Sequence, residues 1–348
     1  MAIAPRMQWR MIRYWYQACA KAAKTLFPVV PAATVGYHSA RDSKKEVMSI
    51  DRIKGANGEI GLVTGANGFL GKAICRAFTE AGFDVRALVR NPGEQRTLHP
   101  IARGGIFRCD LPGGIDESAF DGNIRALIHC AYSTAAAPPD QVRRINIEGT
   151  ETLLRLARKA GVRRIVFISS LSAHPAATSL YGRTKLELEG LFTTSADTVI
   201  KPATIIGPGG VFAHTRQMLR RLPVVPLFYA DRKLQTIWIG DACAAILAAV
   251  RGDLPGTFVL AHQQAIPLRE FYRGIASLDG RQPFFLPFPG DLAVAILSTL
   301  EKTGVSLPIH ADNLLGIRNL RWFDPSRDMT ALGISPLSFE ESLKRMER

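Results

Sequence analysis

A glycine-rich turn between an apolar run and a helical pattern restricts the fold of this 348-residue chain more than any other feature. The segment reads LVTGANGFLGKAI, with a strand predicted before it, a helix after it and a second strand about twenty residues on. Such glycines bend the chain, let backbone approach a pyrophosphate and let the helix pack on the sheet, and the N–H groups opening the helix bind phosphate. A tight turn without a ligand is the alternative, which this context disfavours. The candidate dinucleotide contacts here are Gly65, Asn67, Gly68, Phe69, Leu70 and Gly71.

From residue 59 onward, short apolar runs alternate with helical patterns, which predicts strand–helix–strand units and a parallel sheet. Two of the helical patterns end at Gly82 and Gly161, and glycine is the usual stop signal of a helix. We therefore expect an α/β fold built on a doubly wound parallel (Rossmann) sheet. The predicted strands cover residues 59–64, 84–89, 105–109, 126–130, 164–169 and 198–203.

The chain divides into three predicted regions. Residues 1–55 form a basic leader, residues 56–206 a dinucleotide-binding Rossmann domain, and residues 207–348 mainly a smaller substrate-binding lobe, with some segments returning to the Rossmann core. Beyond residue 207 the alternation weakens and Pro and Gly become frequent. Helices are expected over residues 211–221, 240–251 and 289–303, and a closing helix begins at a capping box of Ser338 and Glu341.

The formal net charge of +14 does not indicate a nucleic-acid-binding protein. Residues 1–47 hold eight Lys or Arg and two acids, so the leader contributes six units of the net charge of +14, and the remaining excess is spread without basic runs or interleaved aromatics. We expect a small-molecule substrate and no nucleic-acid partner. The leader is predicted to be disordered or a loosely attached amphipathic helix; contact of that helix with a membrane surface, an organellar presequence and a true start at Met48 are the less favoured alternatives.

Cysteine spacing and hydropathy favour a cytoplasmic protein without a metal site. The five cysteines are scattered, with no paired spacing of a zinc or redox motif, which is typical of thiols in a reducing compartment. No stretch approaches eighteen consecutive apolar residues, so no membrane span is expected.

The end of the second predicted strand bears on the choice of dinucleotide. An acidic residue at this point favours NAD, because it accepts from the ribose 2′-hydroxyl, whereas arginine pairs with the extra phosphate of NADP. The segment reads VRALVRNP, with Arg86 and Arg90 and no acid until Glu94. The sequence therefore favours NADP over NAD, with Arg90 the better-placed contact. The alternative is that either arginine is simply a solvated residue at the end of the strand.

Over about residues 59–345 the chain resembles the extended short-chain dehydrogenase/reductases, which include nucleotide-sugar epimerases and dehydratases. The resemblance rests on several motifs in order. They are TGANGFLG, Asp110 after the third strand, LIHCAY at the fourth, NIEGT at 146–150, IVFISS at 165–170, YGRTK at 181–185, KPATIIGPGG at 201–210, WIGDACAAI and LGISPLSFEESL.

The resemblance implies a catalytic role for Tyr181 and Lys185, which taken alone are ordinary neighbours on a helix. A tyrosine moves a proton to or from the substrate oxygen while a hydride passes between the adjacent carbon and the nicotinamide. A free phenol has a pKa near 10, so it needs a nearby positive charge such as the Lys185 ammonium. Ser170 would orient the substrate oxygen, and Asn146 either completes a proton relay through water or braces its helix.

The remaining cofactor contacts also follow from the resemblance. Asp110 is expected beside the adenine, Ala131 beside the pyrophosphate or nicotinamide, and Lys201 near the nicotinamide amide, along with Tyr181 and Lys185. Lys201 replaces the arginine common before that proline, a change that keeps the charge but loses the planar fork. The family also implies a homodimer through the helices at 146–160 and 181–193.

The sequence leaves the reaction open. A dehydratase is disfavoured because Ser170 is followed by Leu171 and Ser172 instead of an Asp–Glu pair that could supply the acid and base for elimination of water.

An epimerase or oxidoreductase acting at a hydroxyl or ketone carbon of a sugar nucleotide is favoured by the second lobe and by three arginines that could bind a diphosphate, Arg216, Arg220 and Arg221. A short Ser170–Tyr181 connection and the absence of an acid after the second strand favour an NADPH-dependent carbonyl reductase on a small or hydrophobic substrate. A non-catalytic NADP(H)-binding accessory protein is the third alternative.

Overall fold

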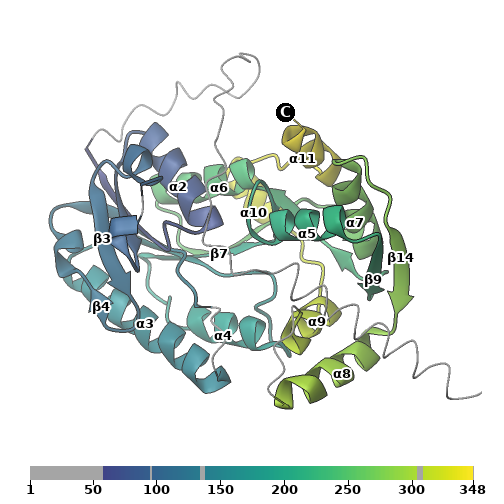
Figure 1. The fold of residues 1–348 in the computed structure, drawn as a ribbon. Helices are drawn as coiled ribbons and strands as arrows, with labels where there is room; N and C mark the ends of the chain where they lie inside the picture. Colours follow the sequence, from purple (N-terminus) through teal and green to yellow (C-terminus); the bar gives the residue numbers. More distant parts are fainter. Residues whose placement is uncertain (1–57, 95, 134–137, 304–308, 348) are drawn as a thin grey trace, which may run out of the picture.

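The computed structural model describes residues 58–94, 96–133, 138–303 and 309–347. An eight-stranded sheet forms its centre, in the order β12-β7-β6-β5-β1-β2-β3-β4 (Figure 1). All neighbours pair in parallel except β3 and β4. The strands are β1 (Ile60–Thr64), β2 (Asp84–Val89), β3 (Gly105–Asp110), β4 (Gly114–Ile115), β5 (Ile124–His129), β6 (Arg164–Ile168), β7 (Asp197–Pro202) and β12 (Gly256–Leu260). The α/β fold class and the predicted Rossmann sheet are confirmed.

Helices cover both faces of the sheet. On one face α2 (Phe69–Glu80) packs beside α6 (Ile239–Arg251), and on the other α3 (Pro139–Lys159) packs beside α4 (Leu180–Glu189). Each face has its own apolar core, one around Phe78 and Ile246 and the other around Leu153 and Leu188. Since β1 lies between β2 and β5, the strand order reverses there, and a crevice opens at the carboxyl ends of those strands.

Segments beyond residue 207 contribute to both parts of the molecule. The predicted helices over 211–221, 240–251 and 289–303 are present as α5 (Gly210–Arg221), α6 and α8 (Gly290–Lys302). Helix α6 and strand β12 complete the Rossmann core, and α10 (Ser326–Ala331) packs on β12, where Asp328 accepts a hydrogen bond from the Val259 N–H.

The remaining segments form a smaller lobe around its own apolar core, which includes Leu219, Leu227, Ile275 and Phe339. Its two-stranded sheets are β8 (Thr204–Ile206) with β11 (Thr236–Trp238), β10 (Lys233–Leu234) with β13 (Ile266–Pro267), and β9 (Val224–Phe228) with β14 (Phe284–Phe288). Its other helices are α7 (Leu268–Ser277), α9 (Ala311–Arg318) and α11 (Phe339–Met346). The capping box of Ser338 and Glu341 opens α11 as predicted.

The predictions for residues 1–55 lie outside the described residues. Within the described ranges, no helix combines the length and the apolar character needed to cross a bilayer.

Candidate active site

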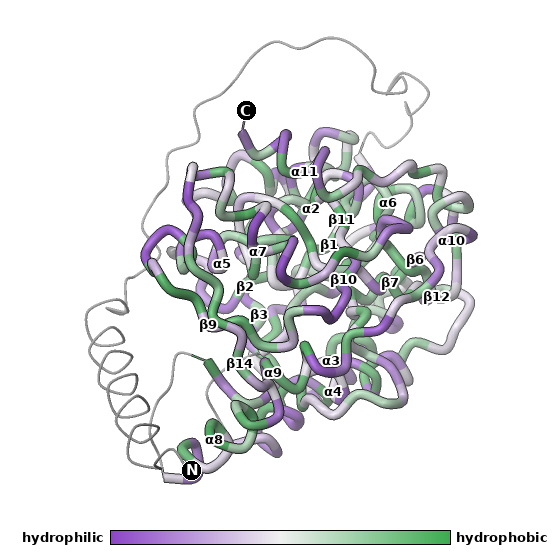
Figure 2. Tube along the Cα trace, turned by 90° about the vertical axis from the view of Figure 1, so that its right-hand side faces the viewer, coloured by the Kyte–Doolittle hydropathy of each residue, from purple (hydrophilic) through white to green (hydrophobic). Residues whose placement is uncertain are grey.

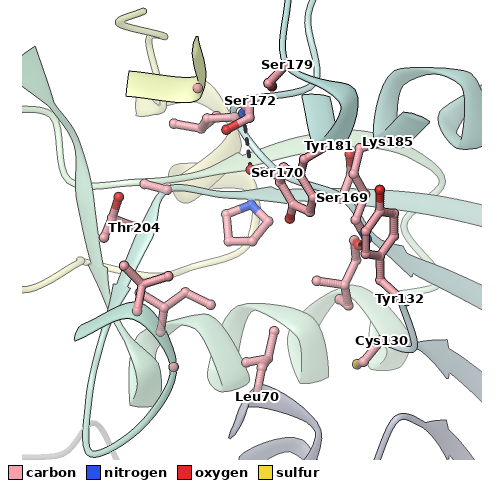
Figure 3. Close-up of a pocket in the computed structure, with 18 of the residues that line it drawn as sticks. Leu70, Cys130, Tyr132, Ser169, Ser170, Ser172, Ser179, Tyr181, Lys185 and Thr204 are labelled. Carbon is pink, nitrogen blue, oxygen red and sulfur yellow. Dashed lines mark hydrogen bonds between the residues drawn. The ribbon is translucent and has the colours of Figure 1, made fainter. Parts of the chain in front are cut away.

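A cavity of about 490 Å³ opens at the carboxyl ends of the central strands (Figure 3). One side is formed by the glycine turn after β1 and by Cys130 and Tyr132 after β5. The other side is formed by Thr204 and Ile205 of β8, by the start of α5 and by the segment that follows α9. The cavity therefore lies between the Rossmann core and the smaller lobe, as expected for the crevice of a doubly wound sheet.

The glycine turn has the shape that a pyrophosphate requires. Gly65 adopts a φ of +62°, which side-chain-bearing residues rarely adopt, and its carbonyl oxygen accepts from the Gly68 N–H at 2.9 Å. A Cβ atom on Gly71 would lie 2.2 Å from that same Gly65 oxygen. Helix α2 begins without a side-chain cap, so its first N–H groups are left for an anion. These residues fit a bound dinucleotide, with Phe69 and Leu70 lining the cavity and Asn67 exposed in the turn.

Tyr181 and Ser170 meet inside the cavity. Tyr181 lies in the first turn of α4, whose N-cap Ser179 accepts from the Gly182 N–H at 3.1 Å. Ser170 follows β6, and its hydroxyl oxygen accepts from the Ser172 N–H at 3.1 Å (Figure 3). Burial raises the pKa of the Tyr181 phenol, and a hydrogen bond with Ser170 partly offsets that rise. The phenol is therefore protonated at neutral pH and can donate.

Lys185 lies one turn after Tyr181 and lines the same cavity. Its ammonium donates to the Ile168 carbonyl at 2.7 Å and lies over the rings of Tyr132 and Phe167, at 4.8 and 4.7 Å from their centres. Burial lowers the pKa of Lys185 to about 8, while the neighbouring Cys130 and Glu189 act to raise it. The ammonium thus stays charged at neutral pH in the cavity that also holds the Tyr181 phenol.

Glu189, which the sequence analysis missed, lies one further turn along α4. Its carboxylate accepts from the Ser169 hydroxyl and from the Lys201 ammonium, at 2.7 and 2.9 Å from the latter. Lys201 also donates to the Ala173 carbonyl at 2.6 Å. This buried network ties α4 to both sides of the segment that carries Ser170. The spacing of Tyr181, Lys185 and Glu189 by four residues was the available sequence signal.

Lys201, which was expected near the nicotinamide amide, does not line the cavity in this structure. Successive side chains of a strand point to opposite faces, so Lys201 and Pro202 of β7 cannot both reach the cavity. Pro202 lines the cavity, whereas Lys201 is bound to Glu189 on the face covered by α4.

Asn146 takes the bracing role among the two that the sequence left open. Its side-chain oxygen accepts from the Ser133 N–H at 2.8 Å, and its amide nitrogen donates to the Ser133 and Val142 carbonyls. Because both polar ends are engaged by backbone, the side chain fixes the segment after β5 against α3. It does not line the cavity, so the proton-relay alternative has no support in this arrangement.

The smaller lobe holds the start of the catalytic helix. Asp312 of α9 accepts from the backbone N–H groups of Leu180 and Tyr181, at 2.6 and 3.4 Å. His174, which lines the cavity, shares a 3.1 Å hydrogen bond with the Asn319 carbonyl that follows α9. Helix α9 therefore fixes both the connection before Tyr181 and the helix that carries it. No local sequence pattern indicated this contact.

The adenosine end of the expected cofactor site is marked by charged groups on β2 and β3. Arg90 lies 3.3 Å from Asp110, and its side chain is 67% exposed. Arg86 instead donates to the carbonyls of Ala119 and Asp121, so it braces the structure. Ala131 lies against the turn, its N–H donating to the Thr64 hydroxyl at 3.1 Å. Of the two arginines, only Arg90 is left facing solvent at the strand end.

The arginines that the sequence suggested for binding a diphosphate lie outside the cavity. Arg216 forms a bidentate pair with Asp279, both bonds at 2.8 Å, and Arg220 lies 3.7 Å from the same carboxylate. Neither they nor Arg221 line the cavity. Among the described lining residues, the charged side chains at neutral pH are Lys185 and Arg321, since burial lowers the pKa of His174.

Comparison with known proteins agrees with this geometry. Residues 61–261 match the family described as "NAD dependent epimerase/dehydratase family". A ceramide reductase of Caulobacter vibrioides is 30% identical over 251 residues, covering 68% of this chain and 76% of that protein. A putative dihydroflavonol 4-reductase of Synechocystis is 26% identical, covering 81% of this chain and 92% of its own length.

Solved structures show the same fold at low identity. The epimerase Mth375 of Methanothermobacter thermautotrophicus aligns with a TM-score of 0.68 at 17% identity, covering 86% of this chain and 94% of its own. A UDP-galactose 4-epimerase aligns with a TM-score of 0.61 at 21% identity, covering 83% and 97%.

Proposed function

Because the chain belongs to the NAD-dependent epimerase/dehydratase family, whose relatives are NAD(P)-dependent enzymes, we propose that it is an NADPH-dependent reductase of a largely apolar ketone or aldehyde. The observation that carries this proposal is the lining of the cavity on the side away from the glycine turn. Leu171, Ile205, Val211 and Leu320 line that side, and no acidic side chain is among the described lining residues. An apolar wall binds an apolar substrate by burial.

The positions of the arginines argue against a nucleotide sugar. A sugar nucleotide carries a diphosphate, which arginine forks bind well. Arg216 is held by Asp279, and neither Arg216 nor Arg220 lines the cavity, which leaves Arg321 as the cation among the described lining residues on the substrate side. The relatives named above support a reductase, since they include a ceramide reductase and a putative dihydroflavonol 4-reductase.

The residues of the cavity supply the proton chemistry of a carbonyl reduction. When bound, a nicotinamide cofactor supplies the hydride. Ser170 orients the carbonyl oxygen, and Tyr181 donates its phenolic proton to that oxygen. Lys185 stabilises the phenolate that remains. Glu189 and Lys201 hold the Ser170 segment against α4, and Asp312 holds the start of that helix.

The proposal is tested by the nucleotide that the purified protein retains and by its turnover. We expect a protein that is largely free of nucleotide, that binds NADPH more tightly than NADH, and that oxidises NADPH with long-chain ketones or aldehydes. Release of tightly held NAD(H) on denaturation, with interconversion of UDP-glucose and UDP-galactose, would instead identify an internally recycling epimerase.

Replacing Arg90 with alanine is expected to raise the KM for NADPH by about tenfold and to leave the KM for NADH unchanged. A charge-assisted contact with phosphate contributes about 1.5 to 3 kcal/mol, and the exposure of Arg90 places the effect at the low end. Steady-state kinetics with both nucleotides measure the change. An equal loss with NADH would mean that Arg90 acts on the fold and does not read the 2′-phosphate.

The turnover number for carbonyl reduction is expected to fall as the pH rises past about 8. Lys185 is charged below its pKa, which burial lowers to about 8, and the phenolate of Tyr181 loses its support when that charge is lost. The groups that face Lys185 are Cys130, Glu189, the neutral His129 and the rings of Tyr132 and Phe167.

The variant Glu189→Gln is expected to shift this fall to lower pH, because removing the carboxylate lowers the pKa of Lys185 further. The matched control is Glu187→Gln, on the same helix, whose carboxylate is exposed and pairs with Arg143. Equal pH profiles for the two variants would contradict the role assigned to Glu189.

A further inference from the structure

The two-stranded sheet of β9 and β14 carries apolar side chains on both of its faces. One face packs into the smaller lobe through Val225, Leu227 and Phe285. The opposite face is formed by three pairs in register, Val224 with Phe284, Pro226 with Leu286 and Phe228 with Phe288. All six of those side chains are apolar. A sheet with one solvated face normally alternates apolar with polar residues, so this pattern indicates a face that binds something.

This outer face is open among the described residues. The exposed fractions are 64% for Phe284, 48% for Val224 and 42% for Leu286. Strand β14 lies at the edge of the molecule, and β9 and β14 are coloured hydrophobic there (Figures 1 and 2). The chain passes from β14 into α8, where Leu292 is 52% exposed. We call the six strand residues and Leu292 the ribbon face.

Arginines gather at one end of the ribbon face. Arg220 and Arg221 end α5 just before β9, and Arg281 comes shortly before β14. Because β9 and β14 run parallel, all three lie at the end where both strands begin. One carboxylate, that of Asp279, pairs with Arg216 and lies 3.7 Å from Arg220, so positive charge exceeds negative charge within this cluster. At the far end Asp291 pairs with Arg318 and accepts from Tyr229.

We propose that the ribbon face docks on the surface of an anionic lipid bilayer. The aromatic and aliphatic side chains would enter the boundary between headgroups and acyl chains, and Arg220 and Arg281 would bind lipid phosphates. Seven side chains are too few for a stable interface between two copies, which needs about 20 to 30 residues on each side.

The test is sedimentation of the full chain with vesicles, without nucleotide or substrate, so that the result is independent of the proposed reaction. Wild-type protein is expected to bind mixed phosphatidylcholine–phosphatidylglycerol vesicles and to bind phosphatidylcholine vesicles much more weakly. The variant Phe284→Ser/Leu286→Ser is expected to weaken binding by at least about tenfold. Arg220→Gln/Arg281→Gln is expected to weaken it by about thirtyfold on anionic vesicles, since each arginine near the surface contributes about 1 kcal/mol.

Two controls make the test specific. Arg103→Gln/Arg163→Gln removes the same charge from exposed positions on the Rossmann core, and Trp322→Gln removes an exposed aromatic outside the ribbon face. Both should bind vesicles like the wild type, and all variants should keep its circular dichroism spectrum. The proposal would be overturned if the wild-type protein did not bind anionic vesicles, or if the ribbon-face variants bound them as well as the control variants do. A dimer in solution that the Phe284→Ser/Leu286→Ser variant abolishes would assign the face to self-association instead.

Discussion

Replacing Tyr181 with phenylalanine is expected to lower turnover by about a hundredfold to ten-thousandfold and to leave NADPH affinity nearly unchanged. The variant removes only the phenolic oxygen, so the ring still packs edge-to-face on Tyr132 with centroids 5.2 Å apart. What is lost is the proton that the buried, protonated phenol donates beside Ser170. Stopped-flow or steady-state oxidation of NADPH with a ketone substrate measures turnover, and a fluorescence titration measures binding.

Tyr132→Phe is the matched control, because Tyr132 lines the same cavity and its ring also faces the Lys185 ammonium, yet it follows β5 and is not on α4. Burial raises the pKa of Tyr132 to about 12, so its phenol too stays neutral. We expect this variant to keep most of the activity. If Tyr132→Phe lost turnover and Tyr181→Phe kept it, the roles of the two tyrosines would be reversed.

The parts of this molecule that sequence predicted well are those fixed by local patterns. The strands of the sheet are continuous apolar runs, and the glycine turn and the capping box of α11 are short-range signals that depend only on neighbouring residues. Strand ends moved by one or two residues, as β5 shows by starting at Ile124 and not at residue 126. Tyr181 and Lys185 were found because both lie on one helix.

Contacts between distant segments were not predictable in the same way. Lys201 has the right charge and lies beside a proline that does line the cavity, but strand alternation places its side chain on the other face, beside Glu189. Asp312 reaches α4 from a helix about 130 residues later in the chain. Arg216 looked available for a phosphate because nothing in the sequence shows that Asp279, 63 residues on, pairs with it. These long-range contacts bear on substrate and cofactor, which local sequence patterns could not resolve.

The variant Gly71→Ala is expected to abolish high-affinity NADPH binding and to lower the unfolding temperature by several degrees. Gly71 lies in the first turn of α2, where alanine would normally stabilise a helix by about 1 kcal/mol. Here the added Cβ would lie 2.2 Å from the Gly65 oxygen and 3.0 Å from the Cα of Ala66, both backbone atoms that cannot rotate away. Relief requires that the turn move, and overpacking of this kind costs about 1 to 3 kcal/mol.

The part that must move is the glycine turn, whose backbone approaches the pyrophosphate. We therefore expect the free energy of NADPH binding to be weakened by more than the free energy of unfolding. Gly113→Ala is the matched control, since a Cβ at this exposed glycine between β3 and β4 would meet nothing within 4 Å. Thermal unfolding with and without NADPH reports both effects, because a bound nucleotide raises the unfolding temperature only when it binds the native turn. A Gly71→Ala protein that NADPH stabilises as much as it stabilises the wild type would mean that the nucleotide does not bind at this turn.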